Sequence, residues 1–553
     1  MEILSMENLT FTYNRSADNR AALKDISLKA FEGDLILLCG PSGGGKTSLL
    51  RIIKSSLMPD GKLEGHISAY VPDEKIGYVF QQPDSQLVME KVFDELIFGC
   101  ENMGLSTSEI NLRLSEITTF FGIEDLTDRE CASLSGGQKQ LVNLASVLMM
   151  EPDILIFDEP LSQLDPIAAT FFINIIKRLH DELGMTIIIC EHELSDILPY
   201  ASKVWFMDDG SVMEFSSPDS FVDHIVRNDN KYLCLLPPLI RAAVSYDSSL
   251  STYPYSVDAF KKLNIPKAFL DNYIDNERVN KPLNTDGEDI TADKNILGLK
   301  RKKNKHIPSD FQPVWGKKLY FKYEKNDRDI LKGLDIHIPY NSFYAIIGGN
   351  GSGKSTLLSL MTGYRTPYKG KFTGLLSDDI NRLLCVSYLP QNPLYMFKET
   401  CLLNDYLEIM HKFNISENDR VDFSKLFISN PLFMPLKDLL SHNASEISGG
   451  ELQAAAILLL HLLKRPILLL DEPTKGMDSI YKKNLSAYLK ELRESGTTII
   501  MVSHDLEFVC ENATHCGLMY DGQIIAEDEC HKILKNNKFY TTSLFRSMRK
   551  DLS

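Results

Sequence analysis

The sequence has no uninterrupted apolar run of about 18 residues, the length that a single helix needs to cross a bilayer. The nearest stretch, residues 454–470, is interrupted by His461, Lys464, Arg465 and Pro466. These interruptions predict a buried helix, a turn and a buried strand. The first residues also lack the basic and apolar segments of a signal peptide. We therefore expect a chain that does not cross a membrane by itself.

Cysteine pairs at C-x-x-C spacing are absent, although the chain contains ten cysteines. We expect reduced thiols that pack as small apolar side chains, with Cys39 in a core. Basic residues are outnumbered by acidic ones, 59 to 75, and the net charge is −16. A general nucleic-acid binder carries a basic face, so no nucleic-acid partner is expected. The length of 553 residues is enough for about two to four domains.

A phosphate-binding loop is present at residues 40–48, which read Gly-Pro-Ser-Gly-Gly-Gly-Lys-Thr-Ser. An apolar run at 35–39 predicts a strand before it, and the spacing of 48–53 predicts a helix after it. Backbone N–H groups of such a loop surround phosphate oxygens. Lys46 would reach the β- and γ-phosphates, and the Thr47 hydroxyl would bind Mg²⁺. The expected binding residues here are Gly40, Ser42, Gly43, Gly45, Lys46, Thr47 and Ser48.

The same loop returns at residues 348–356, after a second apolar run at 343–347. Two matches, each between a predicted strand and a predicted helix, make a coincidental glycine-rich turn a poor explanation. The expected binding residues of this loop are Gly348, Asn350, Gly351, Gly353, Lys354, Ser355 and Thr356, with Ser355 as the Mg²⁺ ligand.

Pairs of similar residues recur at an offset of about 310 residues, which indicates two copies of one domain. We predict a first domain at 1–227, a linker that is partly mobile at 228–312 and a second domain at 313–553. The linker contains a basic run at 300–305, for which solvation is favoured over contact with anionic lipid headgroups. The paired residues are Tyr13 and Tyr323, Lys46 and Lys354, Gln81 and Gln391, Ser135 and Ser448, Asp158 and Asp471, and His192 and His504.

Each copy has an apolar strand that ends in Asp-Glu-Pro, at 154–160 and 467–473. Asp158 and Asp471 can hold Mg²⁺, and the glutamates that follow, Glu159 and Glu472, can deprotonate an attacking water. Because neighbouring strand residues point to opposite faces, we expect the two acids of each motif to point apart and to have different roles.

Three further residue types follow predicted strands in both copies. Gln81 and Gln391 come after the predicted strands 76–80 and 384–389, where an amide can touch Mg²⁺ or the attacking water. A histidine at the end of another strand can hydrogen-bond a γ-phosphate oxygen, and a tyrosine ring can stack on a base. These residues are His192, His504, Tyr13 and Tyr323.

Together these residues resemble the ABC transporter ATPase family in their order across both copies, and this resemblance covers all of the chain but the linker. Its most specific part is the signature, Leu-Ser-Gly-Gly-Gln at 134–138 and Ile-Ser-Gly-Gly-Glu at 447–451. The resemblance implies an ATPase of α/β class with two P-loop NTPase domains. Each would have a mainly parallel sheet with helices on both faces, an antiparallel β part and a helical lobe that carries the signature.

In this family the signature of one domain caps the ATP bound by the other. The resemblance therefore implies that two ATP molecules with Mg²⁺ bind within one chain. The signature residues that would contact ATP are Ser135, Gly136, Gly137, Ser448, Gly449 and Gly450.

A narrower resemblance is to the fused ATPases of energy-coupling factor importers, which take up vitamins and transition-metal ions. It rests on the local sequence of three segments, 80–86, 389–394 and 471–478, which is similar to that of the corresponding loops in this group. It implies a peripheral protein at the cytoplasmic face of the membrane, with integral membrane partners: a coupling protein and a substrate-binding component. Ile447 and Glu451 depart from the usual signature, which puts equal turnover at the two sites in doubt.

Other functions stay open at this point. One is a tandem ATPase of the same superfamily that acts on the ribosome. The acidic net charge of the chain disfavours it. So do the short spacings from Gln81 to Ser135 and from Gln391 to Ser448, which leave no room for an inserted arm. The fused ATPase of a sugar importer is only weakly disfavoured. A scaffold with inactive sites conflicts with two intact sets of motifs.

Overall fold

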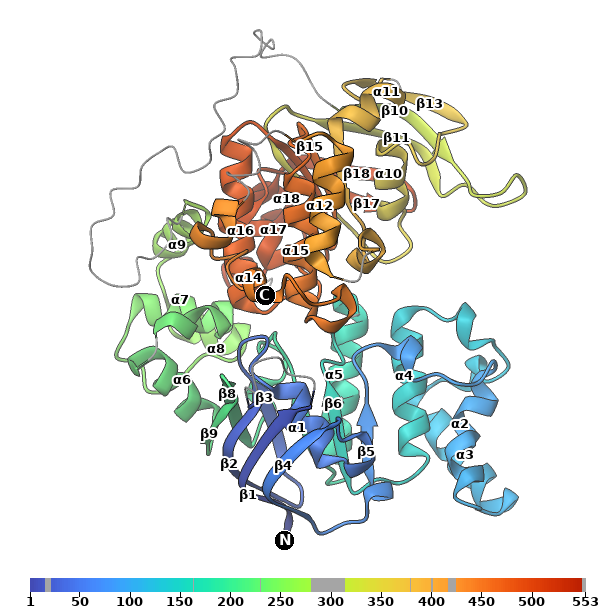
Figure 1. Cartoon of the computed structure of the whole chain (residues 1–553), viewed down its shortest axis with the longest axis vertical. Coiled ribbons are helices and arrows are strands. Elements are labelled where there is room, and N and C mark those ends of the chain that lie inside the picture. Colours follow the sequence, from blue (N-terminus) through green and yellow to red (C-terminus); the bar gives the residue numbers. More distant parts are fainter. Residues whose placement is uncertain are drawn as a thin grey trace. The chain divides into compact units, whose positions relative to one another are not determined.

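The computed structural model describes residues 1–14, 21–162, 164–228, 230–279, 314–377, 379–398, 401–415 and 424–549. Figure 1 shows the chain with its helices and strands labelled. The chain divides into two compact units, Met1–Ser256 and Val257–Ser553. Each unit contains one six-stranded sheet and one three-stranded sheet in the same strand order.

The main sheet of the first unit is parallel except for its last strand. In spatial order its strands are β5 (Ile76–Val79), β6 (Ile154–Asp158), β7 (Thr186–Cys190), β3 (Leu35–Cys39), β8 (Lys203–Asp208) and β9 (Ser211–Phe215). The small sheet is antiparallel and has the order β2 (Leu23–Phe31), β1 (Glu2–Tyr13) and β4 (Gly61–Ala69). Every residue of β3, β6 and β7 is buried, as expected for strands covered on both faces.

The second unit repeats this arrangement. Its main sheet has the order β14 (Val386–Leu389), β15 (Ile467–Asp471), β16 (Thr498–Val502), β12 (Phe343–Ile347), β17 (His515–Tyr520) and β18 (Gln523–Glu529). Only β18 runs antiparallel to its neighbour. The small antiparallel sheet has the order β11 (Leu331–Ile338), β10 (Val314–Phe321) and β13 (Lys369–Gly374).

Helices connect the strands and add a lobe to each unit (Figure 1). Those of the first unit are α1 (Lys46–Ile53), α2 (Val92–Asn102), α3 (Thr107–Phe121), α4 (Gly136–Leu148), α5 (Pro166–Asp181), α6 (Pro218–Asn228) and α7 (Pro238–Tyr246). Those of the second include α8 (Val257–Lys262), α9 (Lys267–Val279), α10 (Lys354–Met361), α11 (Asp379–Cys385), α12 (Leu402–Lys412), α14 (Leu436–Leu439), α15 (Gly449–His461), α16 (Ser479–Glu494), α17 (Leu506–Asn512), α18 (Cys530–Asn536) and α19 (Ser543–Ser547). Helices α2, α3 and α4 pack on one another as a lobe. The predicted α/β class is confirmed.

The main core of the first unit joins one face of the large sheet, α1 and the small sheet. Ile36 and Leu38 of β3 belong to the same apolar cluster as Leu49 and Leu50 of α1 and Phe11 of β1, and all five side chains are fully buried. The second unit has the equivalent cluster around β12, α10 and β10. Helices α1 and α10 each pack against both the large and the small sheet of their unit. This packing fixes the position of the loop that precedes each helix.

Two local predictions have different outcomes. The stretch 454–470 is helix α15 followed by strand β15, as predicted. The predicted strand 384–389 is wrong at its start, because α11 continues to Cys385 and β14 begins at Val386. Leu384 is an apolar residue that is 66% exposed. It is therefore misleading as a sign of a buried strand. No helix in the described part of the chain is long and apolar enough to cross a membrane.

The segment predicted as a linker contains helices α7, α8 and α9. Helix α7 buries Leu239 and Ile240 in the first unit, while α9 packs on α17 in the second. The basic run 300–305 lies outside the described residues. All ten cysteines are free thiols, and Cys39 is buried as expected.

Candidate functional site

The first phosphate loop is shaped by glycines that no other residue could replace without a clash. Gly40 has φ of 139°, and a Cβ there would lie 1.9 Å from the carbonyl oxygen of Met207. Gly45 is the left-handed residue before α1, and its Cβ would lie 2.6 Å from the carbonyl oxygen of Ala22. Among the described residues, no side chain caps α1, and its first turn has no acid. The positive end of the helix dipole is therefore open to an anion.

The lysine of each loop is buried and folded back onto its own loop. Lys46 Nζ donates to the carbonyl oxygens of Gly40 and Pro41 at 2.9 and 2.8 Å. Lys354 makes the equivalent bonds to Gly348 and Gly349 at 3.0 and 2.9 Å. Neutral carbonyls do not cancel the charge of an ammonium. A phosphate group would fit each cradle, because the buried ammonium attracts its negative charge.

The aspartates at the ends of β6 and β15 lie beside the loop hydroxyls. Thr47 Oγ1 donates to Asp158 Oδ1, and Ser355 Oγ donates to Asp471 Oδ1, both at 3.1 Å. Burial raises the pKa of both aspartates, and the neighbouring Glu159 raises that of Asp158 further. A cation would relieve this cost of a buried carboxylate. Oxygen donors of this kind suit Mg²⁺, so each pair fits the predicted metal site.

Sequence reasoning missed a tyrosine that orients each aspartate. Tyr78 donates from its hydroxyl to Asp158 Oδ2 at 2.9 Å, and Tyr388 donates to Asp471 Oδ2 at 3.4 Å. Burial raises the pKa of both tyrosines, so the hydroxyls keep their protons. The signal was present in the sequence, because these tyrosines share the offset of about 310 residues that relates the two copies.

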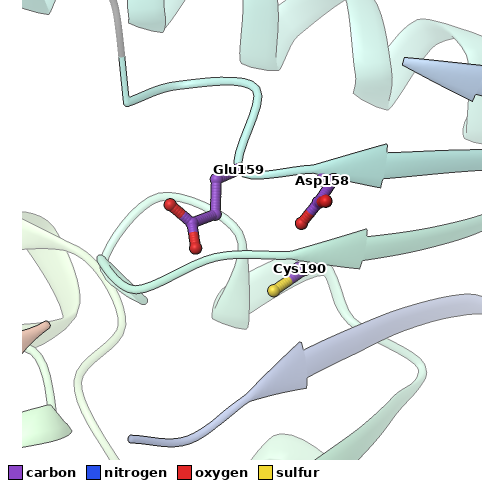
Figure 2. A group of neighbouring side chains, drawn as sticks. All are labelled: Asp158, Glu159 and Cys190. Carbon is purple, nitrogen blue, oxygen red and sulfur yellow. The ribbon is translucent and has the colours of Figure 1, made fainter. Parts of the chain in front are cut away.

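Figure 2 shows Asp158, Glu159 and Cys190 at the carboxyl ends of β6 and β7. Their ligand atoms lie within 4.8 Å of one another, so the expectation that the two acids point apart is wrong. The reason is that Glu159 has φ of 49°, which ends the alternation of the strand. Burial raises the pKa of Cys190 well above its usual value, and a protonated thiol is a poor ligand for Mg²⁺. Only the oxygen donors therefore suit this metal.

The first glutamate is held by the predicted glutamine and histidine. Gln81 Nε2 donates to Glu159 Oε2 at 2.6 Å, and His192 Nε2 lies 2.7 Å from Glu159 Oε1. Glu159 adopts a left-handed backbone that costs a non-glycine residue energy, and Glu472 does the same with φ of 53°. Strain repeated in both copies at the same position indicates a functional requirement.

The second glutamate has a different environment. The backbone N–H of His504 donates to Glu472 Oε2 at 3.2 Å, and His504 Nε2 is 3.5 Å from Oε1. Gln391 is exposed, whereas Gln81 is partly buried. Burial raises the pKa of Glu472 to about 7. Lys475, a residue that sequence reasoning did not single out, has its pKa lowered by burial, and its charge favours ionisation of Glu472. Ser162 occupies its position in the first copy.

The two predicted base-stacking tyrosines are anchored to the helix after each loop. Tyr13 and Ser48 share a hydroxyl–hydroxyl hydrogen bond of 2.6 Å. Tyr323 and Thr356 share one of 3.0 Å. Each tyrosine ring is at least a third exposed, at 36% and 49%. A flat, partly exposed ring fixed beside the phosphate loop is suited to stack on a nucleotide base.

The signature serines begin helices α4 and α15 with capping boxes. In the first unit, Ser135 N donates to Gln138 Oε1 at 3.0 Å. In the second, Glu451 Oε2 accepts from both the backbone N–H and the hydroxyl of Ser448, at 2.8 and 2.7 Å. The second signature therefore carries a carboxylate where the first carries an amide. Gly136, Gly137, Gly449 and Gly450 follow the two serines at these helix starts.

Comparisons with known proteins found a matching family and several relatives. The model of the ABC transporter family matches residues 23–162 and 331–475. An ABC transporter ATP-binding protein of Bacillus thuringiensis is 35% identical over 99% of this chain and 95% of its own length. A protein of Bacillus subtilis named for HMP/thiamine import is 28% identical over 94% of this chain and 90% of its own length.

A solved structure has the same fold over nearly the whole chain. It is the archaeal ribosome recycling factor aABCE1 in complex with the ribosomal stalk protein aP1, with a TM-score of 0.56. The match covers 95% of this chain and 91% of that one, at 20% sequence identity. At this identity the likeness shows the fold alone.

Proposed function

This chain belongs to the ABC transporter family and is an ABC-type ATPase, and from this premise we propose that it powers the import of a small solute through separate membrane proteins. The observation that carries the ATPase part is the duplicated set of phosphate loop, aspartate and glutamate. In each unit these groups meet at the carboxyl ends of the main-sheet strands, where nucleotide ligands of α/β folds bind.

In the first half, Lys46 and the N-terminus of α1 would hold the phosphates, with Thr47 and Asp158 as ligands of Mg²⁺. When bound, Mg²⁺ would neutralise charge on the β- and γ-phosphates. Glu159 would accept a proton from the attacking water. Gln81 and His192 contact the two oxygens of that carboxylate and would orient it toward the water.

In the second half the same roles would fall to the equivalent residues. Lys354, Ser355, Asp471, Glu472 and His504 would bind and hydrolyse ATP, and Gln391 would join them from its exposed loop. Tyr13 and Tyr323 would stack on the bases. We further propose that each signature acts on the nucleotide of the other half, so that Ser448 serves the first ATP and Ser135 the second. The family resemblance supports this exchange.

Import of a vitamin or metal ion is the substrate class we propose. Two observations support this substrate class. The local sequences at 80–86 and 471–478 resemble loops of such importers, and one relative is named for HMP/thiamine import. The partners would be an integral coupling protein and a substrate-binding component, with this chain at the cytoplasmic face of the membrane. The loops after Gln81 and Gln391 would dock on the coupling protein.

The test is to isolate the tagged, full-length protein from its own cells in mild detergent and to identify what comes with it. The proposal predicts integral membrane proteins at constant ratio. Charged substitutions at Leu394 and Tyr395, which are 37% and 80% exposed, should release them while basal ATP hydrolysis persists. Recovery of ribosomal proteins would contradict import and favour the ribosomal alternative. A sugar-binding partner would contradict the substrate class alone.

A further inference from the structure

The base-stacking tyrosine of the second unit has a cation on its ring. The Arg365 guanidinium carbon lies 4.4 Å from the ring centroid of Tyr323 and 6.0 Å from that of Phe321. Phe321 supports Tyr323 edge-on, with 5.2 Å between centroids. The Tyr323 hydroxyl is bonded to Thr356 on α10. Arg365 is therefore part of an aromatic cluster that is fixed to the phosphate loop.

Arg365 is not committed to an acid. It is exposed, and no carboxylate pairs with it within the described ranges. Its guanidinium is planar, stacks on aromatic faces and carries several N–H donors. A side chain of this kind can hold a nucleotide base by stacking and by donating to ring nitrogen or oxygen acceptors.

Among the described residues, the first unit has no counterpart of this cation. Arg365 stands eleven residues after Lys354, and the residue eleven after Lys46 is Leu57. Leu57 packs against the apolar core, and no described cation lies over the ring of Tyr13. Within the described ranges, the ring contact of Tyr13 is with Phe11, edge-on at 5.0 Å. The described residues of the two units thus surround their tyrosines differently.

We propose that Arg365 is a base-binding residue of the second nucleotide site. Its guanidinium holds the base together with the ring of Tyr323. The inference rests on the proposed function, because it assumes that the second phosphate loop binds ATP.

The experiment uses the full chain with Lys46→Ala, so that binding reports the second loop. Titration with a fluorescent ATP analogue labelled on its ribose should show that Arg365→Ala weakens binding about three- to tenfold. Arg365→Lys should recover part of the loss, since it keeps a cation. Lys369→Ala is the matched control, because it removes an exposed cation that lies over the ring of Tyr320 instead, 5.0 Å from its centroid.

Inorganic tripolyphosphate separates base binding from a folding defect. It has no base, so its affinity should be the same with and without Arg365. Equal ATP affinity in Arg365→Ala and its parent would overturn the inference, and so would equal losses for ATP and tripolyphosphate. If the parent itself binds no nucleotide, the proposed function fails at this loop, and the inference fails with it.

Discussion

At the scale of single residues, the two glutamates occupy equivalent places with different supports. Both of the Glu159 carboxylate oxygens have close side-chain partners, from Gln81 and His192. Glu472 accepts from a backbone N–H at 3.2 Å, and the His504 ring is farther away. The sequence predicts the same chemistry for both, because the residue types are the same. It cannot show how far each neighbour stands from the carboxylate.

Glu159→Gln and Glu472→Gln should keep ATP binding and lose hydrolysis at their own sites. The amide preserves the shape of the side chain but cannot take the proton, and losing a general base costs about 10²–10⁴ in rate. Single-turnover hydrolysis by the double variant measures this loss. The control is Glu193→Gln, an exchange at a carboxylate that we assign no part in the reaction. Turnover of the double variant near that of the wild type would show that neither glutamate is the base.

At the scale of elements, the start of each signature helix is a capping box, but the two boxes differ in charge. Glu451 accepts both hydrogens that Ser448 offers, which stabilises α15 and places a negative charge at its N-terminus. Gln138 supports α4 without that charge. The charge difference follows from the sequence, which has Glu451 where the first copy has Gln138. The hydrogen bond from the Ser448 hydroxyl to Glu451 is visible only in the structure.

Glu451→Gln should tighten ATP binding about two- to fivefold at the site that Ser448 serves, because one charge that repels phosphate is removed. The reverse exchange, Gln138→Glu, should weaken binding by a similar factor at the other site. Nucleotide titration of the full chain at low salt measures both changes. The same direction of change in the two variants would contradict this explanation.

Helices α15 and α16 share a contact that makes stability depend on pH. His461 Nδ1 lies 2.6 Å from the Tyr488 hydroxyl, and burial lowers the pKa of His461 from 6.5 to about 4. The unfolded chain therefore takes up a proton between pH 6.5 and 4 that the folded chain does not. Stability is lost as the pH falls through this window, by about 3 kcal/mol in all.

His461→Gln should remove this loss of stability at low pH, since a glutamine does not titrate but has an amide that can hydrogen-bond to the Tyr488 hydroxyl. Urea unfolding at pH 7.5 and pH 5 is the measurement, and the variant's midpoint should fall less than the wild type's over that interval. An equal fall in both proteins would show that His461 is not the group responsible.

At the scale of the whole molecule, the repeat makes most of the fold predictable from the sequence. The strands before both phosphate loops and both acidic motifs lie where the apolar runs predict them. Prediction fails at α11, where exposed leucines mimic the start of a strand, and at Glu159, where a left-handed residue breaks the alternation. Both failures depend on local backbone geometry, which apolar patterns do not report.

The exchange of signatures between the halves can be tested with arginine at each serine, where a bulky side chain would obstruct the nucleotide. In a Lys354→Ala background, the remaining hydrolysis belongs to the first loop. Ser448→Arg should abolish this activity, whereas Ser135→Arg should leave most of it. Steady-state phosphate release distinguishes them. The opposite result would show that each half completes its own site.

If both halves of the chain bind ATP, as we propose, the number of nucleotides bound per chain is the most direct test. The full-length Glu159→Gln, Glu472→Gln double variant is saturated with radiolabelled ATP and Mg²⁺, passed over a desalting column and assayed for nucleotide per chain. We expect two ATP per chain, falling to one when either Lys46→Ala or Lys354→Ala is added. One ATP per chain in the double variant itself, or none, would contradict it.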